Sequence, residues 1–337
     1  MTNILYTDKQ KNEALYPTQR EVLKELNKRG GLDQNLTDEY NRLEAGYKGE
    51  QLVYNYIKEF GQSHWTVMPN VWLDYYGKFE IDLLLITDNH IYIFEIKHFS
   101  GVYEFKNNQC IRNGQKIGHN AISQAQKSFI NVQNLFKRNK FKQHVHGAVV
   151  FTGEHFDVKV HDEVDGLNIL MINQLREYIW QISNTERQNL YKNTDAYDIL
   201  DLLNQHAATN PFQANKITAE IDNRMKKGII CSNCYTPNIY TLQSYLECRC
   251  GMSEPRENAI IRTICEYGII HFDKNLTTYA ILDFFDDEIE RRTAIRHLKK
   301  YFKQIGTGKG TQYENIHQSF WAAYNNFGLK RSRYYRC

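Results

Sequence analysis

Three charged residues, Asp82, Glu95 and Lys97, stand inside or at the end of apolar runs, where charges are costly. The run IYIFEIK alternates its side chains as a strand, so Glu95 and Lys97 share one face with Ile91 and Ile93. Both faces of the run are apolar upstream, which predicts a central strand. Asp82 interrupts the neighbouring run FEIDLLLI, and hairpin pairing of the two runs would bring it close to Glu95. Charges placed there need a partner or a metal ion.

Two carboxylates at one point form a hard oxygen site that suits Mg²⁺, or Mn²⁺ in its place. A lysine beside them can stabilise negative charge on a phosphate or help to deprotonate an attacking water. Phosphodiester hydrolysis requires this combination. The alternative is a structural Glu95–Lys97 ion pair with Asp82 capping the hairpin, which the loose spacing of the three residues would favour if nothing else were known.

The elements that must position these residues follow from apolar spacing and turn signals. Helices are expected from about Thr37 to just before Gly61 and over residues 121–139. Strands are expected at HWTVMPNVWL with a break at Pro69, and at 79–86, 90–99, 101–105, 110–117, 146–153 and 166–173. Residues 41–180 therefore read as one mixed α/β domain.

Within this domain four short motifs follow one another. They are Glu44-Ala45-Gly46-Tyr47-Lys48-Gly49-Glu50, Glu80-Ile81-Asp82-Leu83-Leu84-Leu85, Phe94-Glu95-Ile96-Lys97 with Gly101, and Asn120-Ala121-Ile122-Ser123-Gln124. Together they resemble the nuclease-related domain (NERD) of the PD-(D/E)XK nuclease superfamily. The resemblance covers about residues 41–180 and implies a restriction-endonuclease-like core, a mixed sheet flanked by helices. Ile81 stands where the superfamily motif has Pro, which is a common departure.

Carried over position by position, the resemblance implies these catalytic residues: Glu50, Asp82, Glu95, Lys97 and Gln124. Asp82 and Glu95 would bind the catalytic Mg²⁺ or Mn²⁺ together with the backbone carbonyl of Ile96. Lys97 would be the catalytic lysine. Glu50 would assist from the first core helix, because Gly49-Glu50 fits the motif better than Glu44 does. Gln124 would match the helix glutamine of the resolvase-like branch.

Four of the seven cysteines crowd into twenty residues, at Cys231, Cys234, Cys248 and Cys250. Two close pairs separated by a hairpin-length spacer are typical of a structural Zn²⁺ site with four thiolate ligands. The second pair is C-x-C where C-x₂-C is usual, and Gly251 after it suits the tight turn of a zinc knuckle. So short and polar a segment could bury little core without a metal. Four reduced buried thiols are the alternative.

The last fifty residues hold eleven Lys and Arg against three acidic residues, although the whole chain carries a formal charge of only +3. Helices are expected at 257–267, 277–285 and 287–303, followed by the turn GTGKG. This order resembles a winged-helix domain. The residues expected to contact DNA are Arg291, Arg292, Arg296, Lys299, Lys303 and Lys309. The alternative is a solvated basic helix in a packing domain that does not bind DNA.

Six segments are therefore expected. They are an N-terminal helical segment (1–40), the NERD-like domain (41–180), a helical connector (181–225), a zinc ribbon (226–256), an α-rich winged-helix-like domain (257–325) and a basic tail (326–337). The function expected is that of a Mg²⁺-dependent DNA nuclease in the cytoplasm, since no apolar run is long enough for a membrane helix. The rival is a non-catalytic DNA-binding regulator or scaffold with a nuclease-like fold. RNA as substrate and a homodimer stay open.

Overall fold

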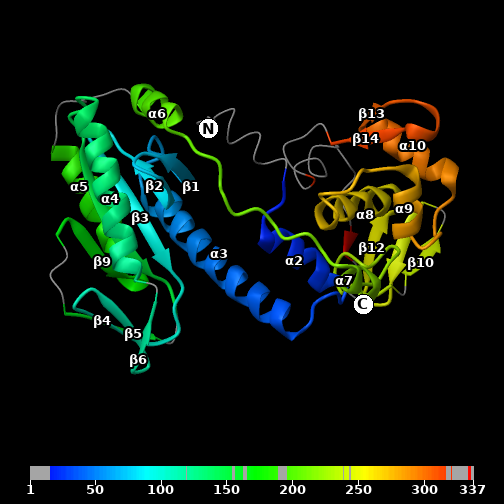
Figure 1. Cartoon of the computed structure of the whole chain (residues 1–337), viewed down its shortest axis with the longest axis horizontal. Coiled ribbons are helices and arrows are strands. Elements are labelled where there is room, and N and C mark those ends of the chain that lie inside the picture. Colours follow the sequence, from blue (N-terminus) through cyan, green and yellow to red (C-terminus); the bar gives the residue numbers. More distant parts are fainter. Residues whose placement is uncertain are drawn as a thin grey trace. The chain divides into compact units, whose positions relative to one another are not determined.

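The computed structural model describes residues 16–118, 120–153, 156–161, 165–188, 196–237, 239–242, 244–315, 320 and 333–334. The chain divides into two compact units (Figure 1). The first unit is Arg42–Thr209, and the second joins the described residues of 11–41 to those of 210–337. Residues 1–15 of the expected N-terminal segment lie outside the described residues, as does all of the expected basic tail except Arg333 and Tyr334.

The first unit is built on a five-stranded mixed sheet in the order β1-β2-β3-β7-β9. Its strands are β1 (Thr66–Asp74), β2 (Lys78–Ile86), β3 (His90–Lys97), β7 (His144–Phe151) and β9 (Leu167–Met171). Strands β1, β2 and β3 pair antiparallel, while β3, β7 and β9 pair parallel. Strand β3 is central and buried along its length except at Lys97, as its two apolar faces predict.

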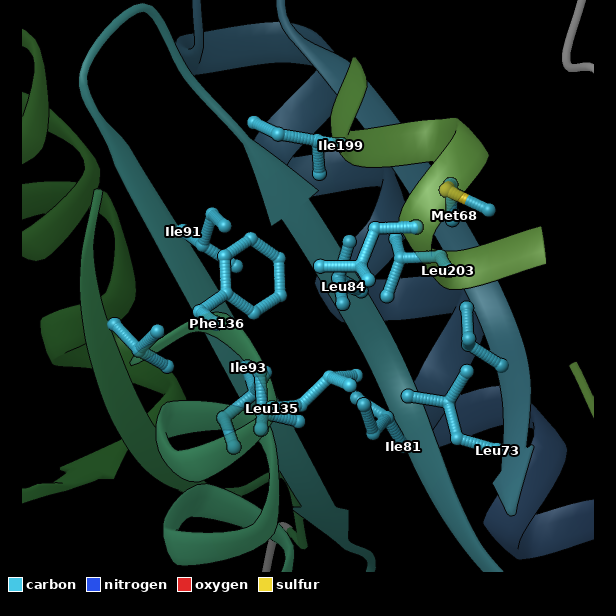
Figure 2. Packing of buried hydrophobic residues seen from close by; sticks show 14 of the residues in the cluster. Met68, Leu73, Ile81, Leu84, Ile91, Ile93, Leu135, Phe136, Ile199 and Leu203 are labelled. Carbon is cyan, nitrogen blue, oxygen red and sulfur yellow. The ribbon is translucent and has the colours of Figure 1, made fainter. Parts of the chain in front are cut away.

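Helices cover both faces of this sheet. On one face α4 (Ala121–Arg138) and α6 (Ala196–Gln205) pack on a core that includes Ile81, Leu84 and Ile93, as Figure 2 shows. On the other face α3 (Gln34–Phe60) and α5 (Leu175–Gln188) pack on Leu83 and Phe94. The short η1 (Ile172–Gln174) leads from β9 into α5. The mixed α/β core flanked by helices is therefore confirmed.

A second, four-stranded sheet in the order β6-β5-β4-β8 lies in the same unit. It contains β4 (Gly101–Lys106), β5 (Gln109–Arg112), β6 (Gln115–Ile117) and β8 (Phe156–Val160). Tyr103 and Phe105 of β4 pack with Phe151 at the end of β7. The segment 101–117 was expected as short antiparallel strands and forms them, whereas β8 was not expected. Strand β8 pairs parallel with β4 across more than fifty residues of chain, and local pattern carries no signal of that pairing.

Two details of the first unit differ from the expectation. Strand β1 does not break at Pro69, which pairs with Leu83; the irregular residue is Asn70, with φ of 52°. Proline is tolerated there because β1 is an edge strand and needs no outward N–H donor. The expected connector also begins later than residue 181. Helix α6 packs into the sheet core, and Ala207 forms a bridge with Leu73 of β1.

The second unit combines helices with small sheets. Its helices are α2 (Gln19–Lys28), α7 (Ala219–Arg224), α8 (Arg256–Ile270), α9 (Thr278–Phe284), α10 (Arg291–Tyr301) and the short η2 (Gly308–Gly310). Its strands are β10 (Ile239–Leu242), β11 (Tyr245–Cys248), β12 (Met252–Pro255), β13 (Lys303–Ile305), β14 (Gln312–Glu314) and β15 (Arg333–Tyr334). Strand β15 pairs with β12, so these two residues of the expected tail belong to a sheet.

A buried ionic network joins the parts of the second unit. Arg262 of α8 lies 2.9 Å from Glu254 of β12 and 2.7 Å from Glu266, which also pairs with Arg29 at the end of α2. Arg29 donates to the carbonyls of Lys226 and Gly228, at 2.8 and 3.1 Å. Two cations thus offset two carboxylates, and removing one partner would leave an uncompensated buried charge. Among the described helices, none is long and apolar enough to cross a membrane.

Candidate functional site

Strand pairing is interrupted around Asp82. In the β1–β2 ladder, Pro69 pairs with Leu83 and Val71 with Ile81, but the left-handed Asn70 between them has no partner. The β2–β3 ladder runs from Ile86 back to Leu83, and Asp82, the next residue towards the start of β2, is not part of it. The Asp82 carboxylate takes over part of this pairing, because its Oδ2 accepts the Ile96 N–H at 2.6 Å. The opening of both ladders leaves Asp82 beside the end of β3.

Glu95 and Lys97 lie at that end of β3, as strand alternation predicts. Lys97 Nζ is 2.6 Å from Glu95 Oε1, and their side chains are 18% and 3% exposed. The Ile96 amide that binds Asp82 lies between them in the chain. The structure therefore brings together Asp82, Glu95 and Lys97, and the ion pair of the structural alternative is present as one part of a larger charged group.

Burial and mutual repulsion raise the carboxyl pKa values in this group. Desolvation, helped by the charge of Asp82, raises the pKa of Glu95 to about 8 against the opposing effect of Lys97. Desolvation also raises the pKa of Asp82, although Lys97 and the Ile96 N–H oppose it. Desolvation would lower the pKa of Lys97, but the carboxylates of Glu95 and Asp82 outweigh it and the pKa rises. Lys97 thus stays protonated, and its single positive charge is too little to keep all the neighbouring carboxyl groups ionised at their usual pKa values.

A third carboxylate, Glu80, belongs to the same electrostatic group and was not assigned a role from sequence. Desolvation and then the charge of Asp82 raise the pKa of Glu80 to about 7, while a hydrogen bond from Trp72 and the charge of Lys97 oppose the rise. Glu80 is half-buried on β2, two residues before Asp82. The period of two in a strand places such residues on the same face, and this signal could have identified it.

Helix α3 reaches the site through a glycine. A Cβ at Gly49 would lie 2.5 Å from Thr152 Oγ1 and 3.2 Å from the Cβ of His98, so only glycine fits against these two residues. They follow β7 and β3, and His98 Nδ1 lies 3.2 Å from Thr152 Oγ1. Glu50 comes next on the helix and is half-buried. The Gly49-Glu50 motif therefore marks the point where α3 meets the strand ends next to Lys97.

Helix α4 brings Gln124 to the sheet. Asn120 begins the helix, because its Oδ1 accepts the N–H groups of Ile122 and Ser123. One turn beyond Gln124, Ser128 donates to the carbonyl of Glu80 at 3.4 Å, so this part of α4 lies over β2. The Oε1 of Gln124 is buried and has no hydrogen-bond partner within the part of the chain that the structure describes. A buried acceptor of this kind fits a site that completes its hydrogen bonds with a bound group.

The donor set suits a hard divalent cation. Asp82 and Glu95 offer carboxylate oxygens, and one lysine faces three acids of raised pKa. Within the described residues, the four cysteines form the one group in which three or more candidate ligand atoms lie close together, so Glu80 is not a third close ligand here. Two protein carboxylates with the remaining positions left to water or phosphate is the pattern typical of Mg²⁺.

The four cysteines of the second unit come together as the spacing predicts. All four Sγ atoms lie within 4.8 Å of one another, and Cys231–Cys250 and Cys234–Cys248 are separated by 3.6 and 3.5 Å. Four sulfurs at about 2.3 Å from a tetrahedral Zn²⁺ would be roughly 3.8 Å apart. The cluster therefore has the size of a zinc site with four thiolates.

Two tight turns form this cluster. Residue Tyr235 follows Cys234 with φ of 58°, and Gly251 follows Cys250 with φ of 84°. The N–H of Gly251 donates to the carbonyl of Cys248 at 3.0 Å, which folds the short C-x-C pair back on itself. The spacer between the pairs includes β10 and β11, which pair antiparallel as expected.

The basic residues lie on one side of α10 and on the hairpin after it. Arg291, Arg292, Arg296 and Lys299 are exposed, while Ala294 and Leu298 of the same helix are buried. None of these four cations has an ion-pair partner among the described residues. Lys303 lies 3.9 Å from Glu314 on the paired strands β13 and β14, and Lys309 lies in η2 between them.

Comparison with known proteins agrees with the site geometry. Residues 45–152 match the family model of NERD, the nuclease-related domain. This range runs from within α3 to the residue after β7 and contains Gly49, Asp82, Glu95, Lys97 and Gln124. No curated protein and no solved structure matches the chain. The first unit therefore contains a nuclease-related domain.

Proposed function

We propose that the protein is a divalent-metal-dependent nuclease that hydrolyses DNA phosphodiester bonds. One observation carries this proposal: Glu80, Asp82 and Glu95 surround a single Lys97 at the point where both strand ladders open. Such an excess of buried negative charge is costly in a structural element and useful in a metal site. The match to the nuclease-related domain supports phosphodiesters as the substrate class.

Asp82 and Glu95, with the backbone carbonyl of Ile96, would hold the Mg²⁺ or Mn²⁺. When bound, the cation supplies Lewis acidity to a phosphate oxygen and lowers the pKa of an attacking water. Lys97 would donate to a non-bridging phosphate oxygen as negative charge develops on it. Glu50 in the interior of α3 and Gln124 of α4 would position water or phosphate, the latter through its buried Oε1, which has no hydrogen-bond partner among the described residues.

Hydrolysis forms one bond from the water oxygen to phosphorus and breaks the bond from phosphorus to the leaving sugar oxygen. The water proton goes to a carboxylate, and Glu80 suits this role because its pKa of about 7 allows both protonation states near neutral pH. Glu95 is less suited, because its Oε1 is already paired with Lys97. The leaving oxygen takes a proton from solvent.

We further propose that the second unit binds the nucleic acid. Helices α8, α9 and α10 are followed by the β13–β14 hairpin, and Leu276 forms a bridge with Tyr313. This order supports a winged-helix domain with α10 as recognition helix and the hairpin as wing. Its arginines are exposed and have no ion-pair partner among the described residues, which suits phosphate contacts, and the cysteine cluster supports a structural zinc ribbon beside it.

The catalytic prediction concerns three substitutions in the first unit. Asp82→Ala, Lys97→Ala and Glu95→Gln should each lower DNA cleavage in Mg²⁺ by at least about 100-fold, because each removes a ligand or charge that the transition state needs. Cleavage of supercoiled, linear and single-stranded DNA by the purified protein measures this. Glu59→Gln, an exposed change on the same helix as Glu50, should cut like the wild type.

Circular dichroism must show that the variants are folded. Wild-type rates in Lys97→Ala and Asp82→Ala would refute the assignment of the site. Tight DNA binding without cleavage by the wild type would instead favour the regulator or scaffold.

The pH dependence of metal binding follows from the raised pKa values. Glu95, with a pKa of about 8, keeps its proton well above the usual range, so Mg²⁺ must displace that proton when it binds. Mg²⁺ affinity should therefore rise between pH 6 and 9. For the same reason the metal-free fold should lose stability as pH rises from about 4.5 to about 8, since the unfolded chain ionises first.

Calorimetric titration with Mg²⁺ at four pH values measures the affinity, and Glu95→Gln should flatten the profile. Equal affinities at pH 6 and pH 9 in the wild-type protein would contradict the proposed ligands.

The zinc prediction is about one Zn²⁺ per chain, measured by elemental analysis of protein purified without chelators. Cys248→Ser should lose the metal, while Cys110→Ala, a cysteine in the sheet core of the first unit, should keep it. Loss of zinc should increase hydrogen exchange across residues 226–256 and leave β2 and β3 protected. A wild-type protein with no zinc, or exchange that rises equally in both units, is the opposing result.

The DNA prediction concerns α10. Arg292→Gln, Arg296→Gln and Lys299→Gln combined should weaken binding and make the slope of log K against log salt shallower by about 2.7, since each phosphate contact contributes about 0.9. Anisotropy at several salt concentrations in Ca²⁺ measures the slope. The matched control is Lys137→Gln, Arg138→Gln and Lys142→Gln, which removes the same charge from exposed residues in and just after α4. Equal slopes for both triple variants would mean that α10 is only a solvated surface.

A further inference from the structure

A cavity of about 240 Å³ lies in the second unit, between the cysteine cluster and the helix that carries the basic residues. Its apolar lining comes from Ile229 before the first cysteine, Pro237 and Ile239 around the start of β10, Leu246 of β11 and Ile289 before α10. Nothing in the proposed cleavage or phosphate binding uses this space. Aliphatic walls of this kind suit the faces of a flat ring.

Two opposite charges line the same cavity. Arg256 begins α8 and is half-buried, and Glu288 lies just before α10. Among the described residues neither side chain forms an ion pair, with the other or with a third residue, so each charged group remains available to a ligand. Glu288 is held in place, because its Oε2 accepts the Ile229 N–H at 2.7 Å. A carboxylate oxygen has two lone pairs and can accept a second donor.

The ligand that fits must therefore be flat, with paired donors on one edge and paired acceptors on another. Among the four bases, guanine carries two adjacent donors (N1–H and the 2-amino group) and two adjacent acceptors (O6 and N7). Arginine recognises the O6 and N7 pair in bidentate fashion, and a carboxylate accepts from the donor edge. A base can enter such a cavity only when it is unpaired.

We propose that this cavity binds an unpaired guanine of the nucleic acid, with Glu288 on its donor edge and Arg256 on its acceptor edge. The inference rests on the proposed nucleic-acid binding by the second unit and adds a base preference to it. Contacts between the side chains of α10 and the phosphates of the nucleic acid would supply affinity for any strand. The cavity would select strands with an accessible guanine. The preference would favour single strands, overhangs or junctions over intact duplex.

The test uses fluorescein-labelled oligothymidylates with one central variable base, measured by anisotropy in Ca²⁺ so that no strand is cut. The guanine strand should bind about tenfold more tightly than the all-thymine strand, the effect of one good bidentate contact. Inosine, which lacks the 2-amino group, should lose most of that gain. Glu288→Gln keeps an acceptor for the Ile229 N–H but should abolish the preference, as should Arg256→Gln. Glu290→Gln, an exposed neighbour, should retain it.

The ratio of guanine to thymine affinity is the readout, because loss of general electrostatic attraction weakens all strands alike. Tight binding of every strand with no guanine preference would overturn the cavity assignment and leave the proposed function standing. A preference that survives in both Glu288→Gln and Arg256→Gln would also overturn it. Absence of binding to any strand would overturn both proposals.

Discussion

The charge imbalance at the end of β3 is the constraint on which the first unit depends. The carboxyl groups of Glu80, Asp82 and Glu95 all lie near one lysine, Lys97, where burial disfavours the charged form of each group. The fold tolerates them because both ladders open at Asp82 and because Asp82 replaces a strand partner for the Ile96 N–H. Hydrophobic residues would destabilise the fold less at this position, so the presence of three acids supports the proposed metal site.

Strand alternation and apolar runs were enough to place Asp82, Glu95 and Lys97 together, because a buried hairpin leaves little choice of register. The same reasoning missed Glu80, which was read as part of a motif and not as a neighbour of Asp82 on the strand face. The irregular residue Asn70 could not be located either, since the adjacent Pro69 is the stronger break signal. Strand β8 depends on a long-range parallel pairing that leaves no periodic mark in so short a segment.

The second unit is stabilised differently from the first. The charges of Arg29, Glu254, Arg262 and Glu266 are buried and mutually paired, and four thiols close a knuckle whose C-x-C half is shaped by Gly251. The cysteine cluster could be predicted because thiol spacing is a local property. The ionic network could not, since it joins α2 to α8 across more than two hundred residues of sequence. The charged groups inside the unit are paired with one another, whereas Arg291, Arg292, Arg296 and Lys299 of α10 are exposed and have no ion-pair partner among the described residues.

We propose that a divalent cation completes the charge balance at Asp82 and Glu95. The most direct measurement is anomalous scattering from crystals of the full chain soaked in Mn²⁺ near pH 8, where the carboxyl groups give up their protons. We expect an anomalous peak in contact with both carboxylates and with the Ile96 carbonyl. Ordered density for Asp82, Glu95 and Lys97 with no peak between the two acids, while Mn²⁺ is bound elsewhere in the protein, would contradict it.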